Sequence, residues 1–291
     1  MDHLSVLQSK GILKNANSYI LTNKEKKELI DSFYNLAKIN KIDLPKKPNF
    51  NPHTIGLVSK NLTLKDMINL SLTDKKMRET MTPIIENKKN ELRELTAWLS
   101  NLPEESQNYT IEQLDQLTEL HLNDYNLTKI PTFNLPNLQL ISFDNNQLTS
   151  IPSLNFPNLK ELRLRNNRFK KFPIMNFPKL ESLWLNDNQL TSIPSLNLPN
   201  LKEFLIHRNK LKTIYNLNLP NLENLSLSEN NLTNISNLNL PKLKILQLSS
   251  NQLIELPTLS LNLEYLDLKN NPLPETEKER LKYIYGDKVK L

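Results

Sequence analysis

Residues 159–169 read Leu-Lys-Glu-Leu-Arg-Leu-Arg-Asn-Asn-Arg-Phe, and residues 180–190 read Leu-Glu-Ser-Leu-Trp-Leu-Asn-Asp-Asn-Gln-Leu. Both stretches have the form L-x-x-L-x-L-x-x-N-x-L, in which another large apolar residue can replace a leucine. A repeat of this kind predicts a solenoid, in which each turn of chain packs on the next. The same start recurs every 21 residues, with a final step of 20, at Leu117, Leu138, Leu159, Leu180, Leu201, Leu222, Leu243 and Leu263.

Each repeat begins with the pattern of a short strand. Apolar positions 4 and 6 alternate with mostly polar positions 3, 5 and 7, so one face of the strand is expected to be buried and the other open. Position 9 is asparagine in seven of the repeats, where its amide can pair with backbone groups as the chain leaves the sheet. These residues are Asn146, Asn167, Asn188, Asn209, Asn230, Asn251 and Asn271, and the first repeat has Tyr125 at this place.

The second half of most repeats follows the form I-P-x-L-x-L-P-N, as at residues 193–200. Two prolines per repeat exclude a regular helix on the return side and favour an extended path. We therefore predict a solenoid with a parallel β-sheet and an extended, proline-rich convex side. After the repeats, residues 274–285 predict a helix that stops at Gly286 and covers the last repeat with Leu281, Ile284 and Tyr285.

These motifs resemble the leucine-rich repeat, and the resemblance covers residues 117–273 as eight consecutive repeats. The residues before the repeats predict a small all-α N-terminal domain. A helix is expected from Ile84 to Trp98, and Thr110–Gln113 resembles a capping box. The predicted divisions are a helical extension (1–49), a helical segment discussed next (50–81), a helical linker and N-terminal cap (82–116), the repeats (117–273) and a C-terminal helical cap (274–291).

Residues 62–78 read Leu-Thr-Leu-Lys-Asp-Met-Ile-Asn-Leu-Ser-Leu-Thr-Asp-Lys-Lys-Met-Arg and resemble the second half of an F-box. The first half departs from that pattern, because the family's Leu-Pro start falls on Phe50-Asn51. Met77 stands where the family often has tryptophan, although a thioether fills similar apolar space. The resemblance implies that this segment binds a Skp1-like adaptor protein through Ile55, Val58, Leu62, Leu64, Met67, Ile68, Leu70 and Met77.

The sequence contains no constellation of catalytic residues. It has no cysteine, which excludes a thiolate metal site and a cysteine nucleophile. The repeat is similar to that of bacterial effectors in which a ligase domain with a catalytic cysteine follows the repeats, so this chain cannot be such a ligase. None of the four histidines has metal-ligand spacing, and there is no glycine-rich phosphate loop. We expect a protein that is not an enzyme and has no metal or other cofactor.

Binding is expected on the concave face of the sheet, where positions 3, 5 and 7 lie. Neighbouring strands are ~4.8 Å apart, so the residues at these positions in repeats 3 to 5 should form one patch. A tryptophan beside arginines has the composition of an interface hot spot. The predicted target-binding residues are Arg163, Arg165, Trp184, Leu205 and His207, together with Leu140, Ile245 and Tyr265 at position 3.

Taken together, the resemblances imply a non-catalytic substrate-recognition adaptor for a host SCF-type ubiquitin ligase, with Skp1 on the helical segment and an unknown target protein on the concave face. The repeat style suggests an effector that a bacterium secretes into the host cytoplasm. No signal peptide and no apolar run of membrane-spanning length is found.

The alternative is a leucine-rich-repeat interaction protein whose basic N-terminal domain is a cap or docks on an anionic surface, either a membrane or nucleic acid. Residues 1–100 contain 17 Lys and Arg against 11 Asp and Glu, whereas residues 101–291 contain 20 of each. The positive excess therefore belongs to the N-terminal part, where it could attract an anionic partner.

Overall fold

The computed structural model describes residues 62–291, with gaps at residues 72–74, 103–108, 153, 173–176, 195, 197, 216, 237, 258 and 260–261. The chain divides into two compact units. The helical unit extends to Leu117 and includes Phe133–Pro136, and the repeat unit comprises Thr118–Thr132 and Asn137–Leu291. The predicted helical extension (1–49) and residues 50–61 of the F-box-like segment lie outside the described residues.

The described helices of the helical unit are α4 (Leu64–Ser71), α5 (Lys75–Ser100) and α6 (Ile111–Asp115). The predicted capping box of α6 is confirmed, since Thr110 and Gln113 each bond the other's backbone N–H. The helix predicted over residues 84–98 is longer than expected and begins at Lys75. It continues through Pro83, although proline lacks the N–H of the helical bond. The predicted division between residues 81 and 82 therefore falls inside α5.

A buried polar cluster joins the helices of this unit. Lys88 of α5 is 4% exposed, and its ammonium group donates a hydrogen bond to the carbonyl of Asn134. Asp115 of α6 accepts a hydrogen bond from the N–H of Leu64, the first residue of α4, at 2.6 Å. Burial lowers the pKa of Lys88 and raises the pKa of Asp115, while the attraction between the two groups opposes both shifts. The cluster ties α4, α5 and α6 together.

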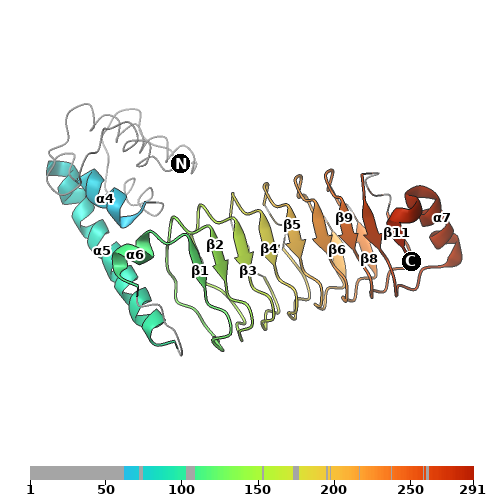
Figure 1. The fold of residues 1–291 in the computed structure, drawn as a ribbon, viewed down its shortest axis with the longest axis horizontal. Coiled ribbons are helices and arrows are strands. Elements are labelled where there is room, and N and C mark those ends of the chain that lie inside the picture. Colours follow the sequence, from blue (N-terminus) through green and yellow to red (C-terminus); the bar gives the residue numbers. More distant parts are fainter. Residues whose placement is uncertain are drawn as a thin grey trace. The chain divides into compact units, whose positions relative to one another are not determined.

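The repeat unit contains a parallel sheet of nine strands in which each repeat contributes one strand and the C-terminal segment adds the last (Figure 1). The strands of the repeats follow one another from green to red in Figure 1. They are β1 (Glu119–His121), β2 (Leu140–Ser142), β3 (Glu161–Arg163), β4 (Ser182–Trp184), β5 (Glu203–Leu205), β7 (Asn224–Ser226), β9 (Ile245–Gln247), β10 (Tyr265–Asp267) and β11 (Val289–Lys290).

The core of the repeat unit consists of the apolar residues that the repeat specifies. Leu162, Leu183 and Phe204 occupy position 4 of repeats 3 to 5, lie in register on adjacent strands and are 0% exposed. The position-9 asparagine has the predicted role. In repeat 3, Oδ1 of Asn167 accepts the N–H of Leu148 at 3.0 Å, and its Nδ2 donates to the carbonyl of Phe143 at 2.8 Å. These bonds connect neighbouring repeats.

The return side is extended where the prolines are present and forms a second small sheet where they are absent. In repeats 5 and 6, Tyr215 and Ser236 replace the proline of the Ile-Pro pair. There the chain forms β6 (Thr213–Tyr215) and β8 (Asn234–Ser236), which pair in parallel. Proline has no N–H for a sheet ladder, so its loss in two adjacent repeats permits this pairing. We did not predict this sheet.

A second unexpected feature is the left-handed backbone at position 8 of all eight repeats. The φ angles there lie between 51° and 64°. Asparagine and aspartate tolerate this conformation better than other residues that have a side chain, and they occupy five of the eight positions. The residues are Asp124, Asn145, Asn166, Asp187, Arg208, Glu229, Ser250 and Asn270.

The C-terminal segment contains the expected helix and, after it, an additional strand. Helix α7 (Glu275–Tyr285) stops at Gly286, whose φ is 56°. Leu281 is 0% and Tyr285 is 5% exposed. A short 3₁₀ helix, η1 (Gly286–Lys288), leads into β11, which pairs with β10 in parallel and covers that edge of the sheet.

Candidate functional site

The open face of the nine-stranded sheet carries the side chains at positions 3, 5 and 7 of each repeat. Because side chains alternate along a strand, these positions face away from the core that positions 4 and 6 fill. In β3, β4 and β5 the outer residues are half-buried and the middle residue is buried. The parallel register places Arg163 beside Trp184 and Trp184 beside Leu205. These three residues form a continuous row across repeats 3 to 5.

The Trp184 side chain is held by polar contacts on two sides. The guanidinium of Arg163 lies over the indole ring, 4.3 Å from the ring centroid, which is a cation–π arrangement. The indole N–H donates a hydrogen bond to the carboxylate of Glu203 at 2.9 Å. Arg163 is itself oriented by an ion pair between its Nε and Glu161. The half-buried indole ring therefore has a defined orientation, and little side-chain freedom remains to be lost on binding a partner.

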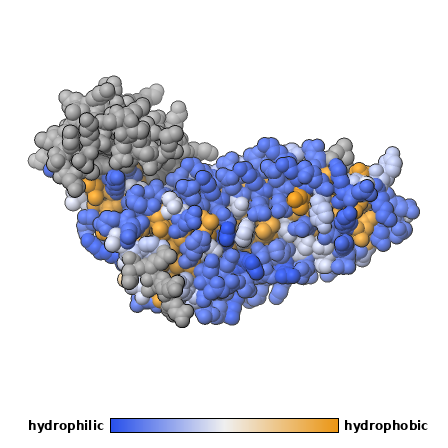
Figure 2. All heavy atoms as spheres, in the orientation of Figure 1, coloured by the Kyte–Doolittle hydropathy of each residue, from blue (hydrophilic) through white to orange (hydrophobic). Residues whose placement is uncertain are grey.

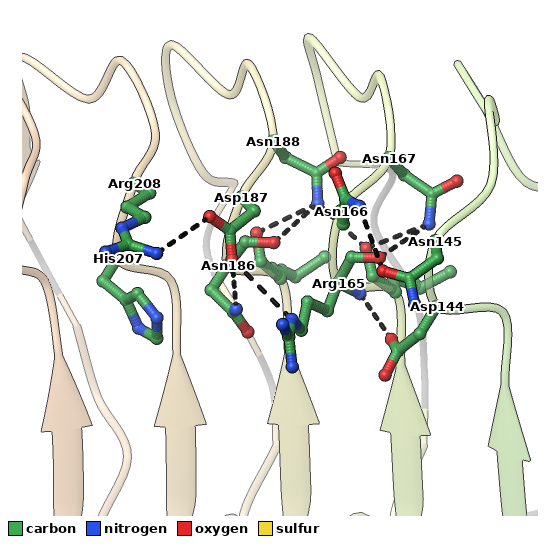
Figure 3. Close-up of polar contacts among 12 residues, drawn as sticks. Asp144, Asn145, Arg165, Asn166, Asn167, Asn186, Asp187, Asn188, His207 and Arg208 are labelled. Carbon is green, nitrogen blue, oxygen red and sulfur yellow. Dashed lines mark hydrogen bonds and ion pairs between the residues drawn. The ribbon is translucent and has the colours of Figure 1, made fainter. Parts of the chain in front are cut away.

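Beyond the strand ends, Asp187 lies between arginines of the two neighbouring repeats (Figure 3). Its carboxylate oxygens are 3.8 Å from Nε of Arg165 and 3.6 Å from an Nη atom of Arg208. The same carboxylate accepts a hydrogen bond from Nδ2 of Asn186 at 2.7 Å. These contacts link repeats 3, 4 and 5, while the side chains of Arg165 and Arg208 stay 54% and 57% exposed.

His207, at position 7 of repeat 5, contacts the next strand. Its Nδ1 is 3.2 Å from Oγ of Ser226 in β7. Burial lowers the pKa of His207 below 6.5, although the charge of Asp187 favours the protonated form, so the imidazole is mainly neutral at pH 7. The pair does not have the geometry of a nucleophilic site. Ser226 is 3% exposed, and among the described residues no carboxylate hydrogen-bonds to the imidazole.

The structure brings five of the eight predicted target-binding residues together on repeats 3 to 5. Arg165 and His207 follow β3 and β5 by two residues, on the same side as the row centred on Trp184. We call this set the open-face patch, and it consists of Arg163, Arg165, Trp184, Leu205 and His207.

The other three predicted residues lie elsewhere on the open face. Ile245 of β9 and Tyr265 of β10 are direct neighbours in the sheet and lie two strands or more from the open-face patch. Leu140 of β2 has Glu119 and Glu161 beside it. The eight residues therefore occupy three separate areas.

Some residues at positions 5 and 7 also have structural roles that we did not predict. Ser142 is 0% exposed, and its hydroxyl donates to Oδ1 of Asn123 at 2.6 Å. The same oxygen accepts the N–H of Asp144 at 2.9 Å, and Asp144 in turn accepts the N–H of Arg165 at 2.7 Å. These hydrogen bonds form a ladder from one repeat to the next. The sequence signal for it is a hydrogen-bond acceptor at position 7 of two successive repeats, Asn123 and Asp144.

The described residues of the F-box-like segment differ in exposure. Leu64 and Met67 are 4% and 2% exposed, whereas Ile68 is 39% exposed and Leu62 is half-buried. Among the predicted Skp1-binding residues whose burial the structure describes, Ile68 is therefore the most exposed. The remaining predicted residues are Leu70 in α4, Met77 in α5, and Ile55 and Val58, which precede the described residues.

The arrangement on the repeat unit suits recognition of another molecule. The face seen in Figure 2 is mainly hydrophilic, with hydrophobic residues scattered among the polar ones.

Across the described ranges there is no group of three or more His, Cys, Asp or Glu residues that could hold a metal ion. In the same part of the chain, no helix has the length and apolar character needed to cross a membrane.

Family models match the chain within the repeats and the C-terminal cap. The model described as Leucine Rich repeats (2 copies) matches residues 136–176 and 178–219, and the model described as Leucine Rich Repeat matches residues 262–283. Neither model includes an F-box. Comparison with curated proteins finds no match. The predicted leucine-rich repeats are confirmed.

Solved structures of bacterial proteins have similar repeats. The leucine-rich-repeat domain of a Shigella effector is 26% identical with a TM-score of 0.53, and the match covers 66% of this chain and 92% of that one. A leucine-rich-repeat protein of Leptospira interrogans is 28% identical with a TM-score of 0.43 and 62% of each chain covered. YopM from Yersinia enterocolitica is 26% identical with a TM-score of 0.40, covering 64% of this chain and 51% of that one. The matches thus span less than two thirds of the Leptospira and Yersinia chains.

Proposed function

Because the chain is a leucine-rich-repeat solenoid, we propose that it is a non-enzymatic scaffold whose open-face patch binds a partner protein. The observation that carries this proposal is the held orientation of Trp184, between the guanidinium of Arg163 and the carboxylate of Glu203. A half-buried tryptophan beside arginines at the centre of a surface is the composition found at interface hot spots. Nothing in the packing of the core requires tryptophan at this position, since the other repeats have His, Ser, Arg, Leu, Gln or Asp there.

The test is capture of proteins from a eukaryotic cell lysate with the wild type and two single variants, followed by quantitative mass spectrometry. Trp184→Ala removes the centre of the patch. Tyr215→Ala is the matched control, because Tyr215 is a 66% exposed aromatic residue of β6, outside the nine-stranded sheet. We expect a partner that the wild type and Tyr215→Ala retain and that Trp184→Ala loses at least about tenfold. Equal retention by all three proteins would refute the role of the patch.

The proposed setting is a eukaryotic host cell into which a bacterium delivers the protein. Support comes from the Shigella effector domain, whose match covers 92% of that chain with a TM-score of 0.53. A binding scaffold acts by bringing its partner close to other proteins and needs no catalytic group of its own. Detection of the protein in host cytosol during infection tests this setting, and its retention inside the bacterium contradicts it.

For the helical unit, the function proposed is docking to a Skp1-like adaptor of an SCF-type ubiquitin ligase. The observation that favours it is the exposure of Ile68 on α4, next to the buried Met67, within the stretch that resembles an F-box. An exposed apolar side chain on a short helix suits an apolar contact with a partner protein. The open-face patch would then present the target for ubiquitination.

The burial of the α4 residues decides which variant tests Skp1 docking. Met67 is 2% exposed, so a charge there would disrupt the unit itself. Ile68→Asp is suitable because the residue is exposed, and Lys65→Asp in the same helix is the matched control. We expect calorimetry to show Skp1 binding by the wild type and Lys65→Asp, and loss of binding by Ile68→Asp. A folded wild type that does not bind Skp1 would refute this role. It would favour the alternative, in which the basic helical unit is a cap or docks on an anionic surface. Binding to an anionic surface would weaken steeply as the salt concentration rises.

A further inference from the structure

Positive charge within the repeat unit is concentrated in two of its repeats. Residues 159–179, which form repeat 3, contain seven Lys and Arg and a single acidic residue, Glu161. Residues 201–221, which form repeat 5, contain four Lys and Arg against Glu203. Repeat 4, between them, contains Glu181 and Asp187 and no basic residue, and repeats 2 and 6 are each net negative. A strongly basic zone is thus flanked by acidic repeats.

Five of these basic residues share one edge of the solenoid, at positions 10, 12 and 13, where the chain has just left the strand. Backbone bonds stack the repeats there. The N–H of Gln189 donates to the carbonyl of Phe169 at 2.9 Å, and the N–H of Lys210 donates to the carbonyl of Leu190 at 2.9 Å. All five side chains are exposed. We call this set the basic edge, and it consists of Arg168, Lys170, Lys171, Lys210 and Lys212.

The basic edge lacks the counter-ions that several other exposed cations of the repeat unit have. Lys202 and Lys244 are each 2.6 Å from a glutamate of the preceding repeat, and Arg208 is 3.1 Å from Glu229. In the part of the chain that the structure describes, no ion pair involves a residue of the basic edge. Five cations without partners on one short edge attract an anionic group from another molecule.

We propose that the basic edge binds an acidic segment of a partner protein. The proposal deepens the proposed function, on which it rests, because repeats 3 and 5, which carry the basic edge, also carry four residues of the open-face patch. Repeats 3 and 5 are two strands apart, which is about 10 Å. An extended peptide advances ~3.3 Å per residue, so acidic side chains three residues apart reach the lysines of both repeats.

The short extent of the basic edge and the residues between its two repeats argue against nucleic acid as the partner. Double-stranded DNA carries a charge every ~1.7 Å of its axis and favours a basic surface that continues beyond two repeats. Here repeats 2 and 6 have no charged residue at positions 10, 12 and 13, so the basic edge does not extend beyond repeats 3 and 5. Single strands depend on aromatic side chains on which bases stack, and the basic edge has Gln189 and Thr191 between its two basic repeats. A short acidic peptide fits this extent.

The experiment measures the fluorescence anisotropy of a labelled peptide of about twelve residues, in which Asp and Glu alternate with Ser, on titration with the full chain. The test variant is Lys170→Glu/Lys210→Glu/Lys212→Glu. The matched control is Lys179→Glu/Lys242→Glu/Lys288→Glu, which makes the same charge change at exposed lysines away from this edge. We expect the test variant to raise the Kd about tenfold or more and the control to raise it less than about twofold.

Two results would overturn the proposal. The first is that both triple variants lose affinity for the peptide equally, or that the wild type does not bind the peptide at low salt. The second is that the wild type binds a thymidine oligonucleotide, or vesicles that contain phosphatidylserine, more tightly than the acidic peptide, and that only the test variant loses this binding. Tyr215→Ala, outside the nine-stranded sheet, should bind the peptide as the wild type does. A wild type that captures a partner through Trp184 but does not bind the acidic peptide would refute this inference and leave the proposed function intact.

Discussion

The asparagine at position 9 carries much of the connection between adjacent repeats. In repeat 3, replacing Asn167 by alanine leaves the buried N–H of Leu148 without its partner, whereas the carbonyl of Phe143 keeps the hydrogen bond from Nδ2 of Asn146. Each unsatisfied buried group costs about 1–3 kcal/mol. We expect Asn167→Ala to lower the free energy of unfolding by about 1–3 kcal/mol, as measured by urea titration. Asn271→Ala is the matched control, because this half-exposed asparagine lies in the last repeat and water can replace its bonds. Equal losses of unfolding free energy in the two variants would contradict this role of Asn167.

His207 reports on the environment of the open-face patch. Burial lowers its pKa in the folded state below 6.5, so the unfolded chain takes up the proton more readily. Stability is therefore expected to fall as the pH drops below about 6.5, and the loss should be complete below the folded pKa. An NMR titration should give a midpoint below 6.5, and Asp187→Asn should lower it further because that carboxylate favours the charged form. A midpoint above 6.5 would mean that Asp187 outweighs burial.

The second small sheet depends on the absence of proline in two neighbouring repeats. The variant Tyr215→Pro/Ser236→Pro restores the Ile-Pro pattern that other repeats tolerate and removes two backbone N–H groups. We expect faster amide hydrogen exchange in β6 and β8, with unchanged protection in β5 and β7. Unchanged amide exchange in β6 and β8 would show that this sheet does not depend on hydrogen bonds from the backbone N–H groups of residues 215 and 236.

The last strand protects an edge of the main sheet. The carbonyl of Lys290 in β11 accepts the N–H of Leu268 at 2.7 Å, and an uncovered strand edge favours pairing between molecules. Deletion of residues 286–291 is therefore expected to raise the average mass measured by light scattering relative to the full chain. Lys290→Ala keeps the backbone bonds and should leave the mass unchanged. A deletion variant with the mass of the full chain would refute this role of β11.

Across the whole molecule, the features that recur with the repeat were predictable and the features that need a spatial neighbour were not. The 21-residue spacing of leucines, the role of Asn167 and the stop at Gly286 are local patterns, and the structure confirms them. The Lys88–Asp115 cluster joins residues on separate helices, so no local spacing reveals it. The patch around Trp184 was predictable from strand register, but its orientation under Arg163 depends on rotamers that a sequence does not display.

The central claim is that a partner protein binds the open face of the repeats, and site-specific photo-crosslinking tests it most directly. A benzophenone amino acid at Ser182, two residues before Trp184 on the same face of β4, should crosslink to a partner in a eukaryotic cell lysate. The same amino acid at Tyr215, outside the nine-stranded sheet, serves as the control. We expect a discrete crosslinked species from position 182 that the Trp184→Ala variant lacks, and none from position 215. Crosslinking of the same protein from position 215 alone, or from both positions regardless of Trp184, would contradict it.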